Sequence, residues 1–90
     1  MNKYLITYEL RNDSKDYSGL YQAIKNISGS WWHYLDSTWI IKGTSLTAHQ
    51  IFEQLKPYID IEKDSILIIK IDITNKQGWL SKKAWEWLDR

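Results

Sequence analysis

His33 is the residue of this 90-residue chain with the clearest capacity for acid–base chemistry. An imidazole titrates near neutrality, so it can take a proton from an attacking group and return it later as a general base and acid. In an alternating strand His33 shares its side with Trp31 and Leu35, an apolar set. That setting also fits a half-buried histidine hydrogen-bonded across a hairpin, and we favour this second interpretation.

Arg11, Lys15 and Lys42 are the cations expected to contact phosphates if the chain binds nucleic acid. Twelve basic residues stand against eleven acidic ones, for a net charge of +1. Dedicated nucleic-acid modules usually carry a strong basic excess, so this balance argues against binding of nucleic acid by electrostatic attraction alone. The six tryptophans can instead stack on unpaired bases, or they can pack in a core or an interface, which we favour strongly for Trp39.

Several function classes lack support in the sequence. The absence of cysteine excludes disulfides, thiolate nucleophiles and cysteine-ligated metals. No phosphate loop, nucleophile elbow or dinucleotide fingerprint points to an enzyme acting on small metabolites. The longest apolar run, Ser65 to Ile71, is too short to cross a bilayer, and no signal-peptide pattern opens the chain. These features predict a cytoplasmic protein without a membrane partner.

A strand followed by a helix is predicted for the first part of the chain. Residues 3–10 alternate between two sides, which is typical of a strand. One side carries Tyr4, Ile6, Tyr8 and Leu10, and the other carries Lys3, Leu5, Thr7 and Glu9. The apolar spacing then becomes helical over residues 17–27, with Asp16 as the expected N-cap and residues 28–30 as the stop.

A hairpin, a second helix and a fourth strand are predicted next. Residues 31–35 and 38–42 are two short aromatic and β-branched runs separated by a gap of hairpin length. Thr47 and Gln50 fit a capping box that opens a second amphipathic helix ending near Pro57. Residues 65–73 read as the last strand of the sheet.

The order of these elements predicts an α+β protein. Strand, helix, strand, strand, helix and strand form a βαββαβ, ferredoxin-like sandwich, with both helices on one face of an antiparallel sheet. We expect one domain over residues 1–90, in which residues 74–90 form an aromatic C-terminal extension. Ser81 is the expected cap of a short final helix that carries Ala84, Trp85 and Leu88 on one side and Trp87 on another.

The fourth strand is apolar on both of its sides, which predicts a covered second face. Ile66 and Ile68 oppose Leu67 and Ile69, whereas a solvated face should alternate with polar residues. Either the C-terminal extension or a second copy of the protein can provide the cover, and we favour a homodimer. The residues expected at the interface are Ile66, Ile68, Trp79, Trp85 and Trp87.

Three segments of the chain resemble a known family. WWHYLDSTWI at residues 31–40, YLITY at 4–8 and KDYSGLY at 15–21 resemble the SinR-like small proteins. That group is similar in fold to the CRISPR adaptation protein Cas-two and to the VapD toxins. The resemblance implies a ferredoxin-like homodimer that either performs metal-dependent nuclease chemistry or grips nucleic acid without catalysis.

The resemblance also implies a role for Glu9. In the Cas-two pattern an aspartate near the end of the first strand is the candidate Mg²⁺ ligand, and Glu9 stands at the matching position. It would pair with its symmetry mate across the dimer, aided by Asp13 or Asp16, to hold Mg²⁺ and activate water. The alternative is a carboxylate that is solvated or paired with Arg11 or Lys42.

Two functions from different classes follow from this sequence. The first is a Cas-two-like homodimer that acts on nucleic acid, as a weak Mg²⁺-dependent endonuclease with Glu9 and His33 as catalytic residues or as a binder. The second is a non-enzymatic interaction module that regulates or inhibits a larger protein complex, which the aromatic excess favours.

Overall fold

The computed structural model of the protein describes residues 2–90. Over these residues the chain forms one four-stranded antiparallel sheet and three α-helices, which confirms the α+β class. The elements in chain order are β1 (Asn2–Glu9), α1 (Ser18–Ser28), β2 (Trp31–Leu35), β3 (Thr38–Thr44), α2 (Ala48–Leu55), a 3₁₀ turn (Lys56–Tyr58), β4 (Ser65–Lys70) and α3 (Lys82–Asp89).

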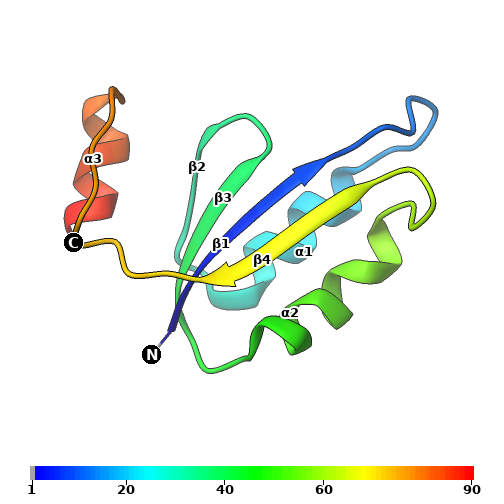
Figure 1. The fold of residues 1–90 in the computed structure, drawn as a ribbon, viewed down its shortest axis with the longest axis horizontal. Helices are drawn as coiled ribbons and strands as arrows, with labels where there is room; N and C mark the ends of the chain where they lie inside the picture. The colour runs from blue at the N-terminus through cyan, green and yellow to red at the C-terminus, as the bar shows by residue number, and fades with distance from the viewer. Residues whose placement is uncertain (1) are drawn as a thin grey trace.

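The sheet has the strand order β2-β3-β1-β4, so β1 lies inside it and β2 and β4 are its edges. The register places Thr7 opposite Thr38 of β3 on one side and opposite Leu67 of β4 on the other. Figure 1 shows α1 and α2 together on one side of the sheet, which we call the front face, while α3 stands apart beside β2. We call the opposite side the back face.

The front face is closed by α1 and α2 around the larger of two hydrophobic cores. The alternation predicted for β1 is confirmed there, since Tyr4 and Ile6 are buried in this core. The other buried members are Leu20, Ile24, Trp39, Ile41, Ile51, Leu55 and Ile59. Helix α2 begins at the predicted capping box, in which the Thr47 hydroxyl accepts from Gln50 N and the Gln50 side chain accepts from Thr47 N.

The ends of α1 correct one prediction and confirm another. The N-cap is Tyr17 rather than Asp16, because the first turn of the helix begins one residue later than expected. Asp16 still receives a hydrogen bond from Ser18 N at 2.9 Å. At the other end Gly29 adopts a left-handed conformation with φ of 71°, which L side chains rarely adopt.

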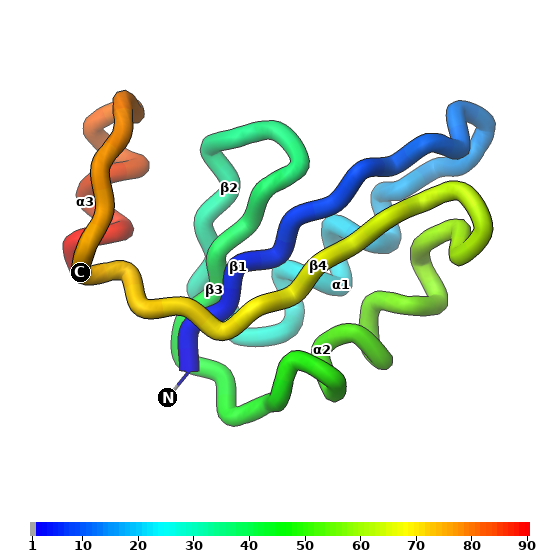
Figure 2. The backbone as a smooth tube through the Cα atoms, in the orientation of Figure 1, coloured from blue at the N-terminus to red at the C-terminus, as the bar shows by residue number. Residues whose placement is uncertain are grey.

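The back face is closed only in part, by the C-terminal extension. Figure 2 shows the chain leaving β4, passing the start of β1 and turning into α3, so that the C-terminus returns beside this connection. A second core forms where α3 meets β2 and β3, and its buried members are Trp32, Ile40, Ala84, Trp87 and Leu88. Ser81 caps α3 as predicted, but Trp87 shares the buried side with Ala84 and Leu88 while Trp85 is only partly buried.

Strand β4 is shorter than predicted, and the side of it that was expected at an interface faces the front core instead. It ends at Lys70 rather than Ile73, after which only the bond from Ile71 N to Lys3 O continues the ladder. Ile66 and Ile68 pack against the front core within the protomer. The exposed apolar residues of this strand are Leu67 and Ile69, at 55% and 47% exposure.

Candidate functional site

The hairpin tip between β2 and β3 and the end of β1 enclose a hollow of about 360 Å³, which we call the hairpin hollow. Its walls are polar and aromatic, and its lining residues are Tyr8, Leu10, Tyr21, His33, Asp36 and Ser37. The hairpin tip is held against β1 by a hydrogen bond from Tyr8 N to Ser37 O at 3.1 Å. Ser37 has a positive φ of 65°, a conformation uncommon outside glycine that often marks functional turns.

His33 occupies the hairpin hollow in a defined orientation. Its ring stacks on Trp39 with centroids 3.9 Å apart and planes 3° from parallel. Its Nδ1 lies 2.9 Å from the Thr38 carbonyl oxygen, and since a carbonyl only accepts, Nδ1 carries the proton. This is the half-buried histidine bonded across the hairpin that the sequence favours. In the neutral ring Nε2 therefore keeps a lone pair that can accept a hydrogen bond or a proton.

Tyr8 contributes a hydroxyl that stays protonated at neutral pH. Burial raises the pKa of Tyr8 above its ordinary value, and the nearby Tyr21 and Asp36 add to the rise. The hydrogen bond donated by Trp39 Nε1 to the Tyr8 hydroxyl, at 3.0 Å, works in the opposite direction and is outweighed. Tyr8 therefore keeps a proton to donate, next to an imidazole and a carboxylate.

An aromatic row continues from the hairpin hollow along the front side of β3. The Tyr8 and Tyr21 rings are 6.3 Å apart, Tyr21 stacks on Trp39 at 6.3 Å, and Trp39 meets Trp31 at 5.4 Å. Lys25 Nζ lies 4.9 Å from the Trp31 ring centre, within cation–π range. Tyr21 and Trp31 are 36% and 38% exposed, so this row offers two accessible ring surfaces beside a cation.

Glu9 lies away from His33, so the structure does not bring the two predicted catalytic residues together. Glu9 lines a different hollow, of about 290 Å³, with Ser65 and Leu67 at the edge between β1 and β4. Its carboxylate is 2.7 Å from the Arg11 guanidinium, which is the pairing that the sequence left open as an alternative. Both side chains of this pair are exposed, so it is a surface ion pair.

Of the residues that the structure describes, Glu9 is the one acidic side chain that lines its hollow within a protomer. Mg²⁺ takes oxygen ligands in near-octahedral geometry, usually one or two carboxylates together with substrate phosphates. Glu9 supplies one carboxylate, which is already paired with a cation. Among residues 2–90, no cluster of three or more acidic or histidine side chains has a spacing that suits a metal. We therefore derive no chemical step through Mg²⁺.

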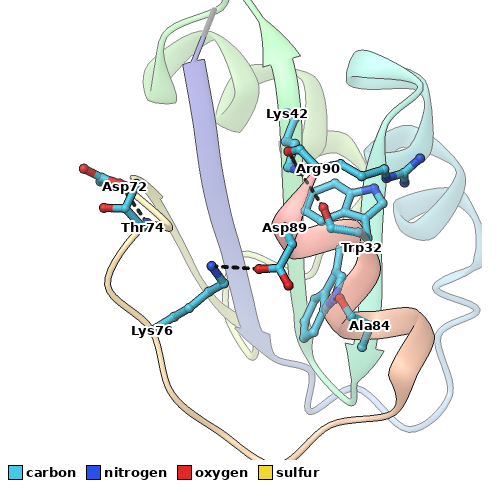
Figure 3. Close-up of polar contacts among 9 residues, drawn as sticks. Trp32, Lys42, Asp72, Thr74, Lys76, Ala84, Asp89 and Arg90 are labelled. Carbon is cyan, nitrogen blue, oxygen red and sulfur yellow. Dashed lines mark hydrogen bonds and ion pairs between the residues drawn. The ribbon is translucent and has the colours of Figure 1, made fainter.

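Lys42 holds the C-terminal helix to the sheet rather than facing solvent as a free cation. Its Nζ donates to Trp87 O at 2.6 Å and to Arg90 O at 3.0 Å, and it lies 4.0 Å from the Trp87 ring centre. Figure 3 shows Lys42 beside Arg90 at the end of α3, and Lys76 reaching Asp89. Burial, with help from nearby positive charges, lowers the pKa of Lys42 below its ordinary value.

A second polar cluster joins the loop after β1 to the loop before β4. The Asp64 carboxylate accepts hydrogen bonds from Arg11 N at 2.8 Å, from Asp60 N at 2.7 Å and from the Tyr17 hydroxyl at 2.7 Å. Burial raises the pKa of Asp64, but these hydrogen bonds outweigh it and lower the pKa below its usual value. Because each acceptor oxygen is occupied by the chain itself, this cluster is structural.

The remaining predicted residues are dispersed over the surface. Lys15 Nζ lies 5.9 Å from the Tyr17 ring centre, and it shares no cluster with Arg11 or Lys42. Trp79 is 99% exposed in the connection before α3, whereas Trp85 and Trp87 pack at the back of the sheet. The interface roles assigned to these tryptophans stay predictions.

Tyr8, Tyr21 and Asp36 are the site residues that the sequence alone did not single out. Tyr8 follows the alternation of a core-facing strand, and Tyr21 follows the apolar face of a helix, so both read as core residues. Asp36 reads as a turn residue. Their convergence depends on the pairing of Thr7 with Thr38, which brings the end of β1 to the hairpin tip.

Within residues 2–90, no helix combines the length and the apolar character that crossing a bilayer requires. Comparison with known proteins found no protein-family model and no curated protein that matches this chain.

Proposed function

We propose that this protein binds single-stranded nucleic acid without cleaving it, using the aromatic row beside the hairpin hollow. The observation that carries the proposal is the run of rings from Tyr8 through Tyr21 and Trp39 to Trp31, with Lys25 over its end. Bases that are not paired expose ring faces, and each base stacked on an aromatic side chain contributes roughly 1–3 kcal/mol. Stacking suits a chain whose net charge is only +1.

The state of the cations supports stacking over electrostatic binding. Arg11 is paired with Glu9, and Lys42 is engaged by the end of α3, so two of the three expected phosphate contacts are already occupied. Affinity for nucleic acid should therefore change little with salt. We expect log K to fall against log salt with a slope of about −0.7 to −1.4, which corresponds to one or two phosphate contacts on a single strand.

Binding of a dye-labelled oligo-dT strand, followed by fluorescence anisotropy, tests the proposal. Tyr21→Ala and Trp31→Ala should each weaken binding by roughly 5- to 100-fold, the loss of one stacked base. Trp79→Ala is the comparison outside the aromatic row, because Trp79 is fully exposed in the connection before α3; a loss as large as that of Trp31→Ala would show that exposed rings bind bases wherever they lie. Absence of binding at low salt, or a preference for duplex over single strands, would contradict the proposal. Cleavage with Mg²⁺ that disappears in Glu9→Ala would show a nuclease instead.

The same proposal includes a ferredoxin-like fold that works as a homodimer. The order β2-β3-β1-β4, with two helices on the front face, supports that arrangement. Leu67 and Ile69 remain exposed side by side on the back of an edge strand, where α3 does not reach. A second copy would remove this apolar surface from water. A solution mass of two chains for the wild type, and of one chain for Ile69→Glu, is the expected result; a single-chain mass for the wild type would contradict it.

A further inference from the structure

The geometry points to the hairpin hollow as a pocket for one guanine base, held by Asp36 at its edge and by aromatic side chains on its face. This inference rests on the proposed binding of single strands and adds a base preference to it. The hollow is large enough for one ring system, at about 360 Å³, and it opens beside the exposed ring of Tyr21. A base of the strand that stacks along the row can therefore turn into it.

The first argument is the set of acceptors in the wall. The Asp36 carboxylate lines the hollow and, within residues 2–90, takes part in no hydrogen bond and no ion pair; Asp36 is exposed, so a ligand would displace water from it. An ionised carboxylate only accepts, and it has two oxygens side by side. His33 adds a further acceptor at Nε2, since its Nδ1 donates to the Thr38 carbonyl.

The second argument is which base can satisfy such a wall. Guanine presents two adjacent donors, N1–H and the N2 amino group, and these match the two oxygens of one carboxylate. Adenine and cytosine each place a ring acceptor beside their amino group, which would face the carboxylate at the cost of an unmade hydrogen bond. Uracil and thymine place a single donor between two carbonyl acceptors. Guanine is the base that the pocket should select.

The third argument is that a phosphate is excluded from the same space. Asp36 is negatively charged and would repel a phosphate group in this partly enclosed hollow. The cation of this surface, Lys25, lies over Trp31 at the far end of the aromatic row. A strand would therefore place its backbone toward Lys25 and a base toward Asp36, which is the orientation required for reading the base edge.

The backbone of the hairpin tip is tied to β1. Ser37 holds a φ of 65°, and its carbonyl oxygen accepts from Tyr8 N, so the turn that carries Asp36 is tied to the neighbouring strand. A base entering the pocket would meet Asp36 without a rearrangement of the loop, which favours binding because little conformational freedom is lost.

The test compares short oligo-dT strands that carry one central guanine, adenine or cytosine, with anisotropy as the readout. The wild type should bind the guanine strand about tenfold more tightly than the others, within the discrimination expected of a bidentate base contact. Asp36→Asn should remove this preference, because the amide offers one acceptor oxygen instead of two, and the loss of its negative charge should raise the affinity for every strand to a similar extent. Glu53→Gln, which neutralises an exposed carboxylate on α2, should leave the preference intact.

The outcomes distinguish failure of the guanine pocket from failure of single-strand binding. Binding of all strands with equal affinity would overturn the guanine pocket and leave single-strand binding in place. Absence of binding to every strand would overturn both. A preference that survives in Asp36→Asn would also overturn the assignment. Far-UV circular dichroism of Asp36→Asn and Asp36→Glu checks that both variants are folded. Asp36→Glu keeps the carboxylate and should therefore restore part of the preference for guanine.

Discussion

The two faces of the sheet are closed by different means. On the front face, α1 and α2 are parts of the connections between strands, and their side chains fill a core in which Ile6, Leu20 and Leu55 are fully buried. On the back face, a single short helix is attached by a long connection and forms a core with β2 and β3 that also packs against Leu5 of β1. Leu67 and Ile69, on the far edge, stay exposed.

The difference shows how a small sheet can divide stability from recognition. The front core is built from the strands and the helices that connect them, and none of its members belongs to the extension. The back core depends on a few contacts of α3, among them the bond from Trp32 Nε1 to Ala84 O at 3.1 Å and the two bonds from Lys42. The aromatic row lies on the front side, where Tyr21 and Trp31 are accessible, so the proposed binding surface and the docking of the tail are separate.

The largest expected effect comes from opening the front core. Leu20→Ala should lower the free energy of unfolding by about 3 kcal/mol, because it removes a fully buried side chain and leaves a cavity. Leu67→Ala removes the same atoms from a back-face site that is half-exposed in one protomer. In the Ile69→Glu background, which should be monomeric, it should cost less than about 1 kcal/mol. Urea denaturation of Leu20→Ala and Leu67→Ala in that background measures the difference; equal losses would mean that Leu67 is buried within the protomer.

Removing the anchor of the extension should have a smaller and more local effect. Trp87→Ala should lower the free energy of unfolding by about 2 kcal/mol, less than full burial of a tryptophan predicts, because the tail can detach while the front core remains. Amide hydrogen exchange should then speed up in α3 and stay slow in α1. Trp79→Ala, at a fully exposed tryptophan, is the control and should change neither. Loss of protection throughout the sheet would show that the two cores fold as one.

The Lys42 contact is the next test of how the extension is held. Lys42→Met keeps the apolar stem but removes two hydrogen bonds to carbonyl oxygens and a cation–π contact, for an expected loss of about 1.5 kcal/mol. Lys70→Met, at an exposed lysine of β4, should have no comparable effect. Thermal or urea unfolding compares the two. Affinity for nucleic acid should be the same in both variants. A loss of affinity in Lys42→Met alone would show that Lys42 contacts phosphate.

The smallest expected effect concerns the loops at the other end of the sheet. The pKa of Asp64 is lower in the folded protein than in the unfolded chain, so its stabilisation is fully present above about pH 4 and is lost as the pH falls through the folded value. Asp64→Asn should lower stability by about 1 kcal/mol at pH 7, and the gap to the wild type should close toward pH 2. Urea midpoints across this range measure it. Asp13→Asn, at an exposed aspartate, should show no such gap.

Local patterns predicted much of the secondary structure. The alternation around Ile6 and the capping box at Thr47 depend on neighbouring residues, so both were readable and both are confirmed. The side on which Ile66 packs was not readable, because β4 is apolar on both sides and only its pairing with β1 decides which side meets the helices. The misplacement of Trp87 on α3 has the same origin, since the helix has tryptophans on neighbouring faces.

The candidate site was less predictable than the fold. His33 and its bond across the hairpin follow from a contact within five residues, and the sequence anticipated them. Tyr8 and Asp36 are far apart along the chain and meet only through the pairing of β1 with β3. Lys42 reads as a surface cation because the helix end that binds it comes 45 residues later.

The sequence by itself determined the number, type and order of the strands and helices around the sheet, together with the N-terminal caps of α2 and α3. These depend on side-chain periodicity and on interactions between near neighbours, which the chain carries in its local order. The tertiary structure decided which apolar side of β4 is covered, where the extension docks and which polar groups meet at the hairpin hollow. These features depend on which apolar side chains are buried by residues distant in the sequence, and such contacts form only when the whole sheet is assembled.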